Sequence, residues 1–334
     1  MDYDLSWERP HCPDNHPLWQ ESDWYVFYDK EAGIGGWHRI GQRPNQGIGQ
    51  VTAAIFAQGG KRFLINQPEM FEVPIGPQDR WDSGFRVGSH ISEAIAPQVK
   101  RFRWYEANCS GDLLLTEAFY TPRGWHKGKP SDAFASFSKV MQSGGKLQGS
   151  GRLQGVITLG DQRYEIDALM HRDRAWGVRD SSKMHYHRLR MLSGTAGPEF
   201  SFASSVVDMP DGGRACMGFV VRGGVEKEIV DLRVAPWLDA DNYSVLGARG
   251  VFTLDDGEIV KIDVHAKQGF IFTLHGTREA ILDTICTFGY QGLSGFCDLA
   301  IGNNPGRGSH IPEAGEVMLA NVVPGLSDFV DYQL

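Results

Sequence analysis

The sequence predicts a mostly β protein, built as a sandwich or barrel of antiparallel strands with few short helices. Three observations lead to this class. Glycine is frequent, with 41 residues among 334. The glycines separate short runs that alternate apolar and polar residues or are rich in β-branched and aromatic types, which is typical of strands joined by turns. Helical periodicity is scarce along the chain.

The first half of the chain contains six such runs. A turn at Gly59-Gly60 joins two of them into a hairpin, and the longest run turns at Gly160-Asp161. The best helical candidate of the whole chain, residues 131–142, also lies in this half. The runs predicted as strands are 24–29, 50–58, 61–67, 99–107, 112–121 and the two arms of 151–173.

The second half continues in the same way. A strong turn signal at Asp255-Asp256-Gly257 splits its longest run into a hairpin. The runs predicted as strands are 199–209, 214–223, 243–266 and 270–276.

A short internal echo indicates two copies of one β unit. The stretch Trp37-His38-Arg39-Ile40 precedes a glycine-rich turn and a strand, and Tyr186-His187-Arg188-Leu189 does so again 149 positions later. No low-complexity segment or long charge run marks a linker between the copies. We therefore expect two domains, residues 1–180 and 181–334.

Composition excludes several classes of protein. A net charge of -8 disfavours a nucleic-acid surface. The start, MDYDLSWERP, lacks the basic and apolar regions of a secretory signal, and no run reaches the roughly 18 apolar residues of a membrane span. Five scattered cysteines without a Cys-x-x-Cys spacing indicate neither a disulfide framework nor a zinc site. These features predict a cytoplasmic protein, and a homodimer would be compatible with them.

The expected boundary carries an unusual concentration of charge, HRDRAWGVRD at 171–180. Side chains alternate between the faces of a strand, so His171 and Asp173 should point one way, and Arg172, Arg174 and Trp176 the other. Carboxylates and guanidiniums form strong charge-assisted hydrogen bonds. The segment is therefore predicted mainly as an architectural clamp with Trp176 as a wedge between domains, and the clamp residues are Asp173, Arg172, Arg179 and Asp180.

The same segment carries a family resemblance. The stretch RDRAWGVRD, preceded by GSGRLQGVITLGDQRYEIDA, resembles the junction motif of bacterial proteins related to hydroxyneurosporene synthase, the carotenoid 1,2-hydratase. That motif usually has His-Ser where this chain has Arg174-Ala175. The GGWHRIGQRPNQG start at 35–47 is also similar to this group.

The resemblance implies a fold and an activity. It implies two tandem lipocalin-like β-barrels, each able to enclose an apolar ligand. Enzymes of the family hydrate isoprenoid double bonds, and more distant relatives close rings by pericyclic reactions. The departure at Arg174 and Ala175 touches the variable centre of the motif, and so it weakens the transfer of activity more than that of the fold.

Hydration of an alkene needs a proton donor, a placed water and aromatic faces that stabilise a cation. Arginines near Asp173 would keep this carboxyl ionised, which argues against it as the donor, and the sequence does not choose among the other acids and bases. The catalytic candidates are Asp173, His171, His38 and His187, with Glu106 and Asp167 as alternative acids.

Ligand contacts are expected from the repeated stretches and their surroundings. The candidates are Trp37, Tyr186, His185, Trp176 and Tyr105. His185 and His187 lie two apart, a spacing that suits two ligands of one metal ion, with His171 as a third. No carboxylate or cysteine lies nearby to complete the set, so no metal is expected, and no nucleotide motif predicts a cofactor.

Two main hypotheses for function follow. The first is a cofactor-independent lyase or isomerase, most concretely a hydratase for an apolar, unsaturated, terpenoid-like substrate bound in a barrel or at the domain interface. The second is a non-catalytic carrier of a hydrophobic molecule, and a scaffold with an unused pocket is a third. A desolvated Asp, Glu or His beside aromatic faces would favour the enzyme, whereas wholly apolar surroundings would favour the carrier.

Overall fold

Antiparallel strands account for most of the described chain. The residues that the computed structural model describes are 3–65, 72–126, 144–180, 186–209, 212–240, 245–273 and 280–303. They form twenty-one strands and four 3-10 helices, and no α-helix occurs among them. The predicted mostly β class is therefore confirmed. The helix predicted at 131–142 lies outside the described residues.

The described chain divides into two compact units. The first contains the described residues up to Asp180, and the second contains 186–303. In neither unit does the described part include a helix with the length and hydropathy needed to cross a membrane.

The first unit is built on one large sheet. Its strands are β1 (Trp19–Asp29), β2 (Ile34–Arg43), β3 (Ile48–Ala57), β4 (Arg62–Ile65), β5 (Glu72–Pro74), β6 (Arg80–Trp81), β7 (Gly84–Val87), β8 (His90–Ala96), β9 (Val99–Glu106), β10 (Cys109–Ala118), β11 (Arg123–His126), β12 (Gly145–Leu159) and β13 (Gln162–Val178). Its 3-10 helices are η1 (Leu5–Glu8), η2 (Pro44–Gln46), η3 (Gln58–Gly60) and η4 (Pro77–Asp79).

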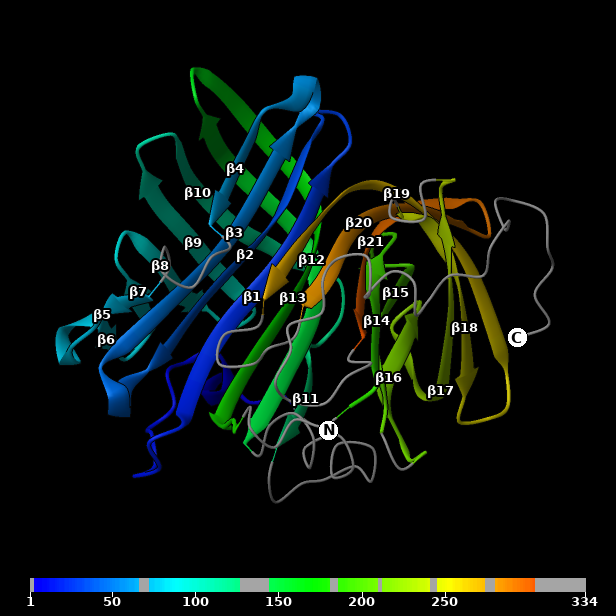
Figure 1. Cartoon of the computed structure of the whole chain (residues 1–334), viewed down its shortest axis with the longest axis horizontal. Helices are drawn as coiled ribbons and strands as arrows, with labels where there is room; N and C mark the ends of the chain where they lie inside the picture. The colour runs from blue at the N-terminus through cyan, green and yellow to red at the C-terminus, as the bar shows by residue number, and fades with distance from the viewer. Residues whose placement is uncertain are drawn as a thin grey trace. The chain divides into compact units, whose positions relative to one another are not determined.

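The strand order brings the two ends of this unit's sequence together. It runs β4-β3-β2-β1-β13-β12-β10-β9-β8-β7-β6, with β5 on β3 and β11 on β12. The first long strand, β1, pairs with the last, β13, and these blue and green strands run side by side in Figure 1. Side chains from both ends of the sequence therefore share one surface of the sheet.

The sheet curls so that its far end contacts β2 and β3. The Gln42 amide of β2 donates hydrogen bonds to the backbone carbonyls of Asp79 and Arg86, at 2.9 and 3.0 Å. Apolar side chains from both ends pack together there, namely Ile40, Val51, Ala53, Phe85 and Val87. The sheet thus encloses an interior, although the hydrogen-bond ladder of the described strands follows an open path.

The second unit is a closed barrel in which the first and last strands pair. Its strands are β14 (Arg188–Thr195), β15 (Phe200–Asp208), β16 (Arg214–Arg222), β17 (Val225–Leu238), β18 (Val245–Leu254), β19 (Ile259–Thr273), β20 (Ala280–Tyr290) and β21 (Leu293–Asn303). Its interior is filled by apolar side chains, among them Leu192, Phe202, Phe252, Val264 and Leu299. The two units together have the lipocalin-like architecture that the sequence predicts.

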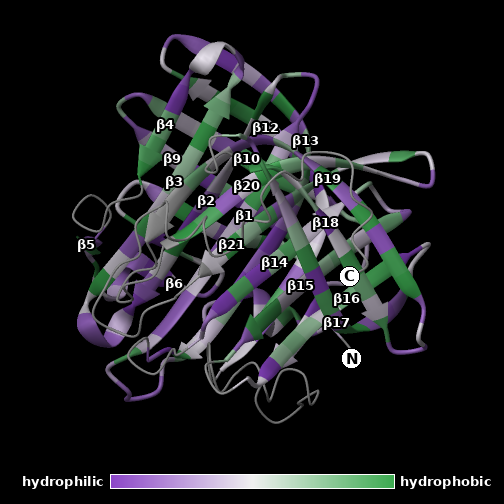
Figure 2. Ribbon diagram, turned by 45° about the vertical axis from the view of Figure 1, so that its right-hand side comes forward, coloured by the Kyte–Doolittle hydropathy of each residue, from purple (hydrophilic) through white to green (hydrophobic). Residues whose placement is uncertain are grey.

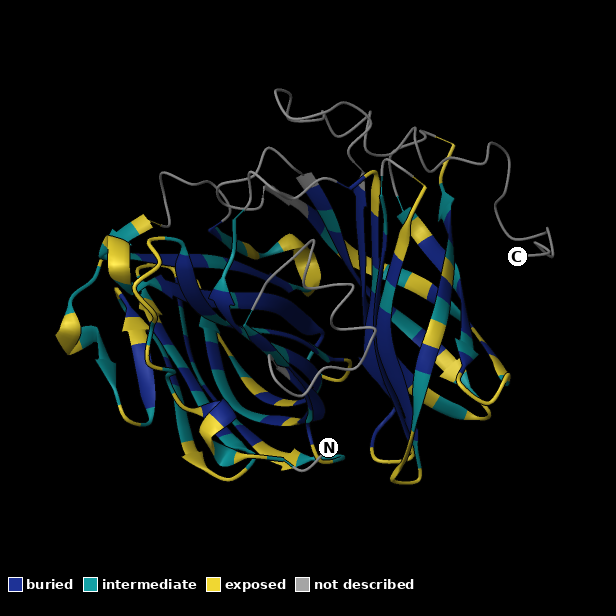
Figure 3. Cartoon of the chain, turned by 90° about the horizontal axis from the view of Figure 1, so that it is seen from below, coloured by how far each residue is buried: buried dark blue, intermediate teal, exposed yellow. Residues whose placement is uncertain are grey.

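The strands follow the alternation of polar and apolar residues. Figure 2 shows hydrophilic and hydrophobic residues following one another along the strands, and Figure 3 shows exposed residues at the turns and at intervals along several strands. Two hairpin turns fall where they are predicted. Gly160 lies between β12 and β13 with φ of 62°, and Gly257 lies between β18 and β19 with φ of 86°. Both values belong to the left-handed region, which glycine adopts without a steric penalty.

The interpretation of the short sequence repeat needs a correction. The strand that pairs with the last strand of its unit is β1 in the first unit and β14 in the second. Trp37 and His38 lie on β2, whereas Tyr186 and His187 directly precede β14. The two similar stretches therefore lie at different places in their sheets. Accordingly, His38 is buried and His187 is exposed, so two copies of one β unit do not place these two histidines at equivalent positions.

Candidate functional site

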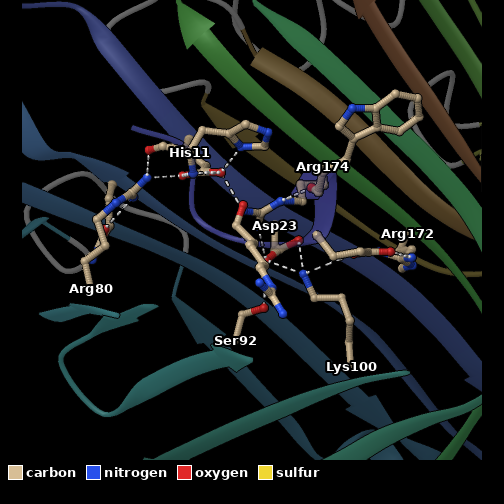
Figure 4. Close-up of polar contacts among 12 residues, drawn as sticks. His11, Asp23, Arg80, Ser92, Lys100, Arg172 and Arg174 are labelled. Atoms are coloured by element: carbon tan, nitrogen blue, oxygen red, sulfur yellow. Dashed lines mark hydrogen bonds and ion pairs between the residues drawn. The ribbon is translucent and has the colours of Figure 1, made fainter. Parts of the chain in front are cut away.

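A cluster of buried charges lies on the inner face of the first unit. Asp23 of β1 is at its centre, 4% exposed. Its carboxylate accepts hydrogen bonds from Lys100 of β9 at 2.8 Å, Arg174 of β13 at 2.7 Å and Ser92 of β8 at 2.7 Å. Figure 4 shows these groups converging on Asp23. One carboxylate thus joins four strands of the sheet.

The segment before β1 completes this cluster. Glu8 at the end of η1 binds Arg172 through both carboxylate oxygens, one of them at 2.8 Å. Arg174 donates hydrogen bonds to the backbone carbonyls of Trp7 at 2.8 Å and Arg9 at 2.7 Å. The two arginines of the junction motif therefore hold the N-terminal segment against the sheet.

Glu21 extends the same cluster along β1. Its carboxylate lies 2.5 Å from Arg174, 2.5 Å from Arg80 and 2.7 Å from Nδ1 of His11. The His11 ring stacks on Trp176, with centroids 3.9 Å apart. Trp176 thus packs within the first unit against the N-terminal segment.

The acids of this cluster remain ionised. Burial alone would raise the pKa of Glu8, but Arg172 and Lys100 outweigh it and lower the pKa to about 2. Burial also acts to raise the pKa of Asp23, and here Arg174 and Lys100 hold it below its ordinary value. Carboxylates this strongly paired are poor proton donors at neutral pH. The cluster is therefore structural.

A second polar group on the inner face is suited to proton transfer. His38 of β2 and His90 of β8 are 1% and 2% exposed. Nε2 of His38 lies 2.7 Å from Nδ1 of His90, and Nε2 of His90 lies 3.1 Å from Glu106. The Glu106 side chain is 36% exposed and also accepts a hydrogen bond from Ser89 at 2.6 Å. A chain of three groups thus leads from solvent into the first unit.

The charge state of this chain fixes the direction of its hydrogen bonds. Burial lowers the pKa of His38 well below its ordinary value, and the neighbouring His90 lowers it further. Burial also lowers the pKa of His90, which Glu106 offsets in part. Both rings are therefore neutral at pH 7. With an ionised Glu106, His90 donates to the carboxylate and His38 donates to His90, which leaves Nδ1 of His38 as a base.

Aromatic rings surround His38. It stacks on Trp104 with ring centroids 5.1 Å apart, and the Tyr25 ring lies 5.3 Å away. Tyr25 in turn contacts Phe102, at 4.2 Å between centroids. Tyr25 is fully buried, and its hydroxyl has no hydrogen-bond partner among the described residues. A desolvated imidazole, a free phenol and aromatic faces therefore lie together.

His171 and Asp173 point to the opposite, outer face of the sheet. Nδ1 of His171 lies 3.0 Å from the Ser150 hydroxyl, and Asp173 forms an ion pair with Lys146. Burial lowers the pKa of His171 to about 3, with a further contribution from Lys146. Trp37 also lies on this face, on the strand beyond β1, with its ring edge-on to Phe56.

The other predicted site residues are dispersed. Tyr105 is 59% exposed on β9, and Asp167 is exposed and bound to Arg152. Tyr186 is buried and His187 exposed at the start of the second unit, and His185 lies outside the described residues. The backbone N–H of Arg179 donates to Leu18, and Asp180 follows it at the end of the first unit. The role of Asp173, Arg179 and Asp180 as parts of a clamp stays a prediction.

Several functional residues of the inner face are not predicted from the sequence. His90 and Tyr25 complete the His38 site, and Glu8, Asp23 and Lys100 form the centre of the charged cluster. Alternation along the WQESDWYVFYD run of β1 would have placed Asp23 and Tyr25 on one face. Nothing local to His90 or Lys100 indicates their partners, since these lie 52 and 77 residues away.

The second unit holds a buried acid that the sequence also does not reveal. Asp283 of β20 and Asp298 of β21 are 4% and 1% exposed. Burial raises the pKa of Asp283 well above its ordinary value, and Asp298 raises it further. Asp283 therefore keeps its proton to a higher pH than an ordinary aspartic acid does.

These features define the class of the protein: a mostly β chain of two lipocalin-like units, the first of which contains a buried acid–base group. Within that class, the chain belongs to the family described as Domain of unknown function (DUF7064), whose model matches residues 4–305. None of the curated proteins matches the chain in sequence.

Solved structures share this fold at low sequence identity. A putative AttH from Nitrosomonas europaea has a TM-score of 0.58 at 9% identity, covering 86% of this chain and 92% of its own. CghA with Sch210972 has a TM-score of 0.58 at 12% identity, covering 87% and 90%. Kievitone hydratase from Nectria haematococca has a TM-score of 0.56 at 10% identity, covering 91% and 93%. Membership of the carotenoid hydratase family stays a prediction.

Proposed function

We propose that this protein is a cofactor-independent lyase or isomerase of the hydratase type, acting on an apolar, unsaturated small molecule. The observation that carries the proposal is the chain His38–His90–Glu106, in which two neutral imidazoles connect a buried base to a carboxylate near solvent. The fold that the chain shares with kievitone hydratase supports the same class of reaction. A terpenoid-like substrate remains our expectation for the bound molecule.

The chain can move one proton without leaving a charge buried. When Nδ1 of His38 accepts a proton from an attacking water, the Nε2 proton passes to His90, and the Nε2 proton of His90 passes to Glu106. The oxygen of the water forms the new bond to one alkene carbon. The same three transfers in reverse deliver a proton to the neighbouring carbon, so that one water is added in total.

The surroundings of His38 suit such a substrate. The faces of Trp104 and Phe102 can bind a conjugated system by stacking. Burial raises the pKa of Tyr25 well above its ordinary value, so its phenol stays protonated and can donate to a substrate oxygen. These neighbours meet the condition that favours an enzyme over a carrier, namely a desolvated histidine beside aromatic faces.

The proposal is tested by incubating the protein with a panel of unsaturated terpenoid and aryl compounds in water enriched in heavy oxygen and deuterium. Wild-type protein should incorporate label into at least one compound, and His38→Gln should reduce the rate by about 100-fold or more. His265→Gln, which changes an exposed histidine of the second unit, serves as the control and should keep the wild-type rate.

Two results would contradict the proposal. Binding of panel compounds without label or rearrangement would identify a carrier. Equal rates for wild type and a folded His38→Gln variant would show that the reaction takes place elsewhere, and Asp283 of the second unit would then be the next acid to test.

A further inference from the structure

The outer face of β1, β2 and β13 carries polar groups that the His38 site does not use. Trp24 of β1 faces Arg39 of β2 on one side and Asp173 of β13 on the other in the strand register. His171 lies two residues before Asp173, on the same face of β13. These four residues form what we call the Trp24 platform.

Two groups of the platform lack partners. Nε2 of His171 is buried without a hydrogen bond, in a residue that is 0% exposed. The Arg39 guanidinium, partly buried, has neither a hydrogen bond nor an ion pair to any residue that the structure describes. An unpaired buried polar atom is costly, so Nε2 of His171, together with an Arg39 guanidinium that has no partner on the same face, indicates that something polar binds there.

The charges of the platform select an anion. The pKa of Arg39 is lowered to about 9 by its own burial and by the nearby guanidiniums of Arg179 and Arg43. The one acid that acts on Arg39, Asp173, already has Lys146 as its partner. A carboxylate placed against Arg39 would relieve this repulsion and form the two-pronged hydrogen bond for which a guanidinium is shaped.

The geometry sets the size and shape of the ligand. Arg39 and His171 lie on β2 and β13 with β1 between them, and His171 is offset by two residues along its strand, so their backbones are about 12 Å apart. The edge of the His171 ring faces the Trp24 indole, with centroids 6.5 Å apart. Trp24 and Arg39 are partly exposed and His171 is fully buried, so solvent reaches the platform at Arg39 and Trp24.

We propose that the Trp24 platform binds a planar, hydroxylated aryl carboxylate of roughly hydroxycinnamate size. Arg39 holds the carboxylate, Trp24 stacks on the planar body, and Nε2 of His171 bonds the hydroxyl at the far end. Ser150 orients the imidazole through Nδ1 and sets its tautomer, and a ligand hydroxyl suits either tautomer because it can both donate and accept. The site lies on the opposite face of the sheet from His38, so it does not depend on the proposed reaction.

Calorimetric titration of the full chain with three probes tests this site. The probes are 4-hydroxycinnamate, cinnamate, which lacks the hydroxyl, and 4-hydroxycinnamyl alcohol, which lacks the carboxylate. Wild-type protein should bind 4-hydroxycinnamate at least about tenfold more tightly than either of the other two, because each loses one polar contact.

Variants then assign each contact. Arg39→Gln should abolish the preference for 4-hydroxycinnamate over the alcohol, and His171→Leu should abolish the preference for it over cinnamate. Arg163→Gln changes an exposed arginine of the same unit and should leave all three affinities unchanged. If His171→Leu fails to fold, Ser150→Ala replaces it, since losing the orienting hydroxyl should reduce the same preference.

The site is overturned if wild-type protein binds none of the three probes at millimolar concentration, or binds all three equally. It is also overturned if folded Arg39→Gln weakens the acid and the alcohol by the same factor, because a guanidinium that acts only on packing would not distinguish them.

Discussion

At the scale of single residues, Asp23 is the group on which the interior of the first unit depends most. It lies on β1 and accepts hydrogen bonds from Ser92, Lys100 and Arg174, on three other strands. Lys100 and Arg174 are each 1% exposed, so water cannot solvate their charges if the Asp23 carboxylate is removed. Removing one partner of a buried ion pair is more damaging than replacing the whole pair, because a charge is left unpaired.

We therefore expect Asp23→Asn to lower the free energy of unfolding by roughly 3–5 kcal/mol. Urea denaturation followed by circular dichroism measures the change. The control is Asp161→Asn at the exposed β12–β13 turn, which should leave the free energy of unfolding almost unchanged although Asp161 also has a lysine partner. A similar loss of stability in both variants would show that the buried ion pairs of Asp23 contribute no more to stability than the exposed pair of Asp161.

At the scale of elements, the β12–β13 hairpin shows what the sequence predicts well. Its turn at Gly160 and the matching turn at Gly257 are encoded locally, by glycines with φ of 62° and 86°. The signal for each turn lies within a few residues of its effect. The N-terminal segment is different, because it is held by Arg172 and Arg174, more than 160 residues away, and no local pattern indicates that Glu8 reaches them.

Replacing Gly160 by alanine should destabilise the hairpin by about 1 kcal/mol, because a Cβ is strained at this φ although the space around it is open. Gly149→Ala on β12 provides the matched control. Its Cβ would meet its nearest neighbours at 3.4 Å, an ordinary contact, and its backbone is not in the left-handed region. Thermal melts of the two variants should therefore differ, and equal melting temperatures would contradict the account of the turn.

The candidate site is harder to predict than the strands because its residues are far apart in the sequence. His38 and Glu106 are both identifiable as candidates, but the link between them is His90, 52 residues from His38. The similarity of Trp37-His38 to Tyr186-His187 suggests that the two stretches are equivalent, but the strand order does not support this. A match of four residues does not show on which strand of a unit the residues lie. Alternation does predict correctly that His171 and Arg172 face opposite sides.

At the scale of the whole molecule, the buried titratable groups make stability depend on pH. Burial lowers the pKa of His171 from 6.5 to about 3, and the arginine and lysine partners of Glu8 lower its pKa from 4.5 to about 2 despite its burial. In both cases the unfolded chain binds protons at a higher pH than the folded one. The contribution of these two groups to the free energy of unfolding is therefore fully present above about pH 6.5, and it is lost as the pH falls toward 2.

Urea denaturation at several pH values between 7.5 and 3 checks this dependence. The free energy of unfolding should begin to fall below about pH 6.5, where the unfolded histidines become protonated, and should fall more steeply below about pH 4.5. Glu8→Gln should make the decrease in the free energy of unfolding below about pH 4.5 less steep. It should leave the decrease between about pH 6.5 and 4.5 unchanged. A constant free energy of unfolding from pH 7 to 4 would contradict the assigned charge states.

The central claim is that His38, His90 and Glu106 act as one path for a proton, and chemical rescue tests it most directly. His90→Gly interrupts the path and leaves space for a free imidazole. With a compound that wild-type protein labels from heavy water, the variant should be slow, and added imidazole should restore the rate in a saturable way while the melting temperature stays constant. A folded variant that reacts at the wild-type rate without imidazole, or that imidazole does not rescue, would contradict the claim.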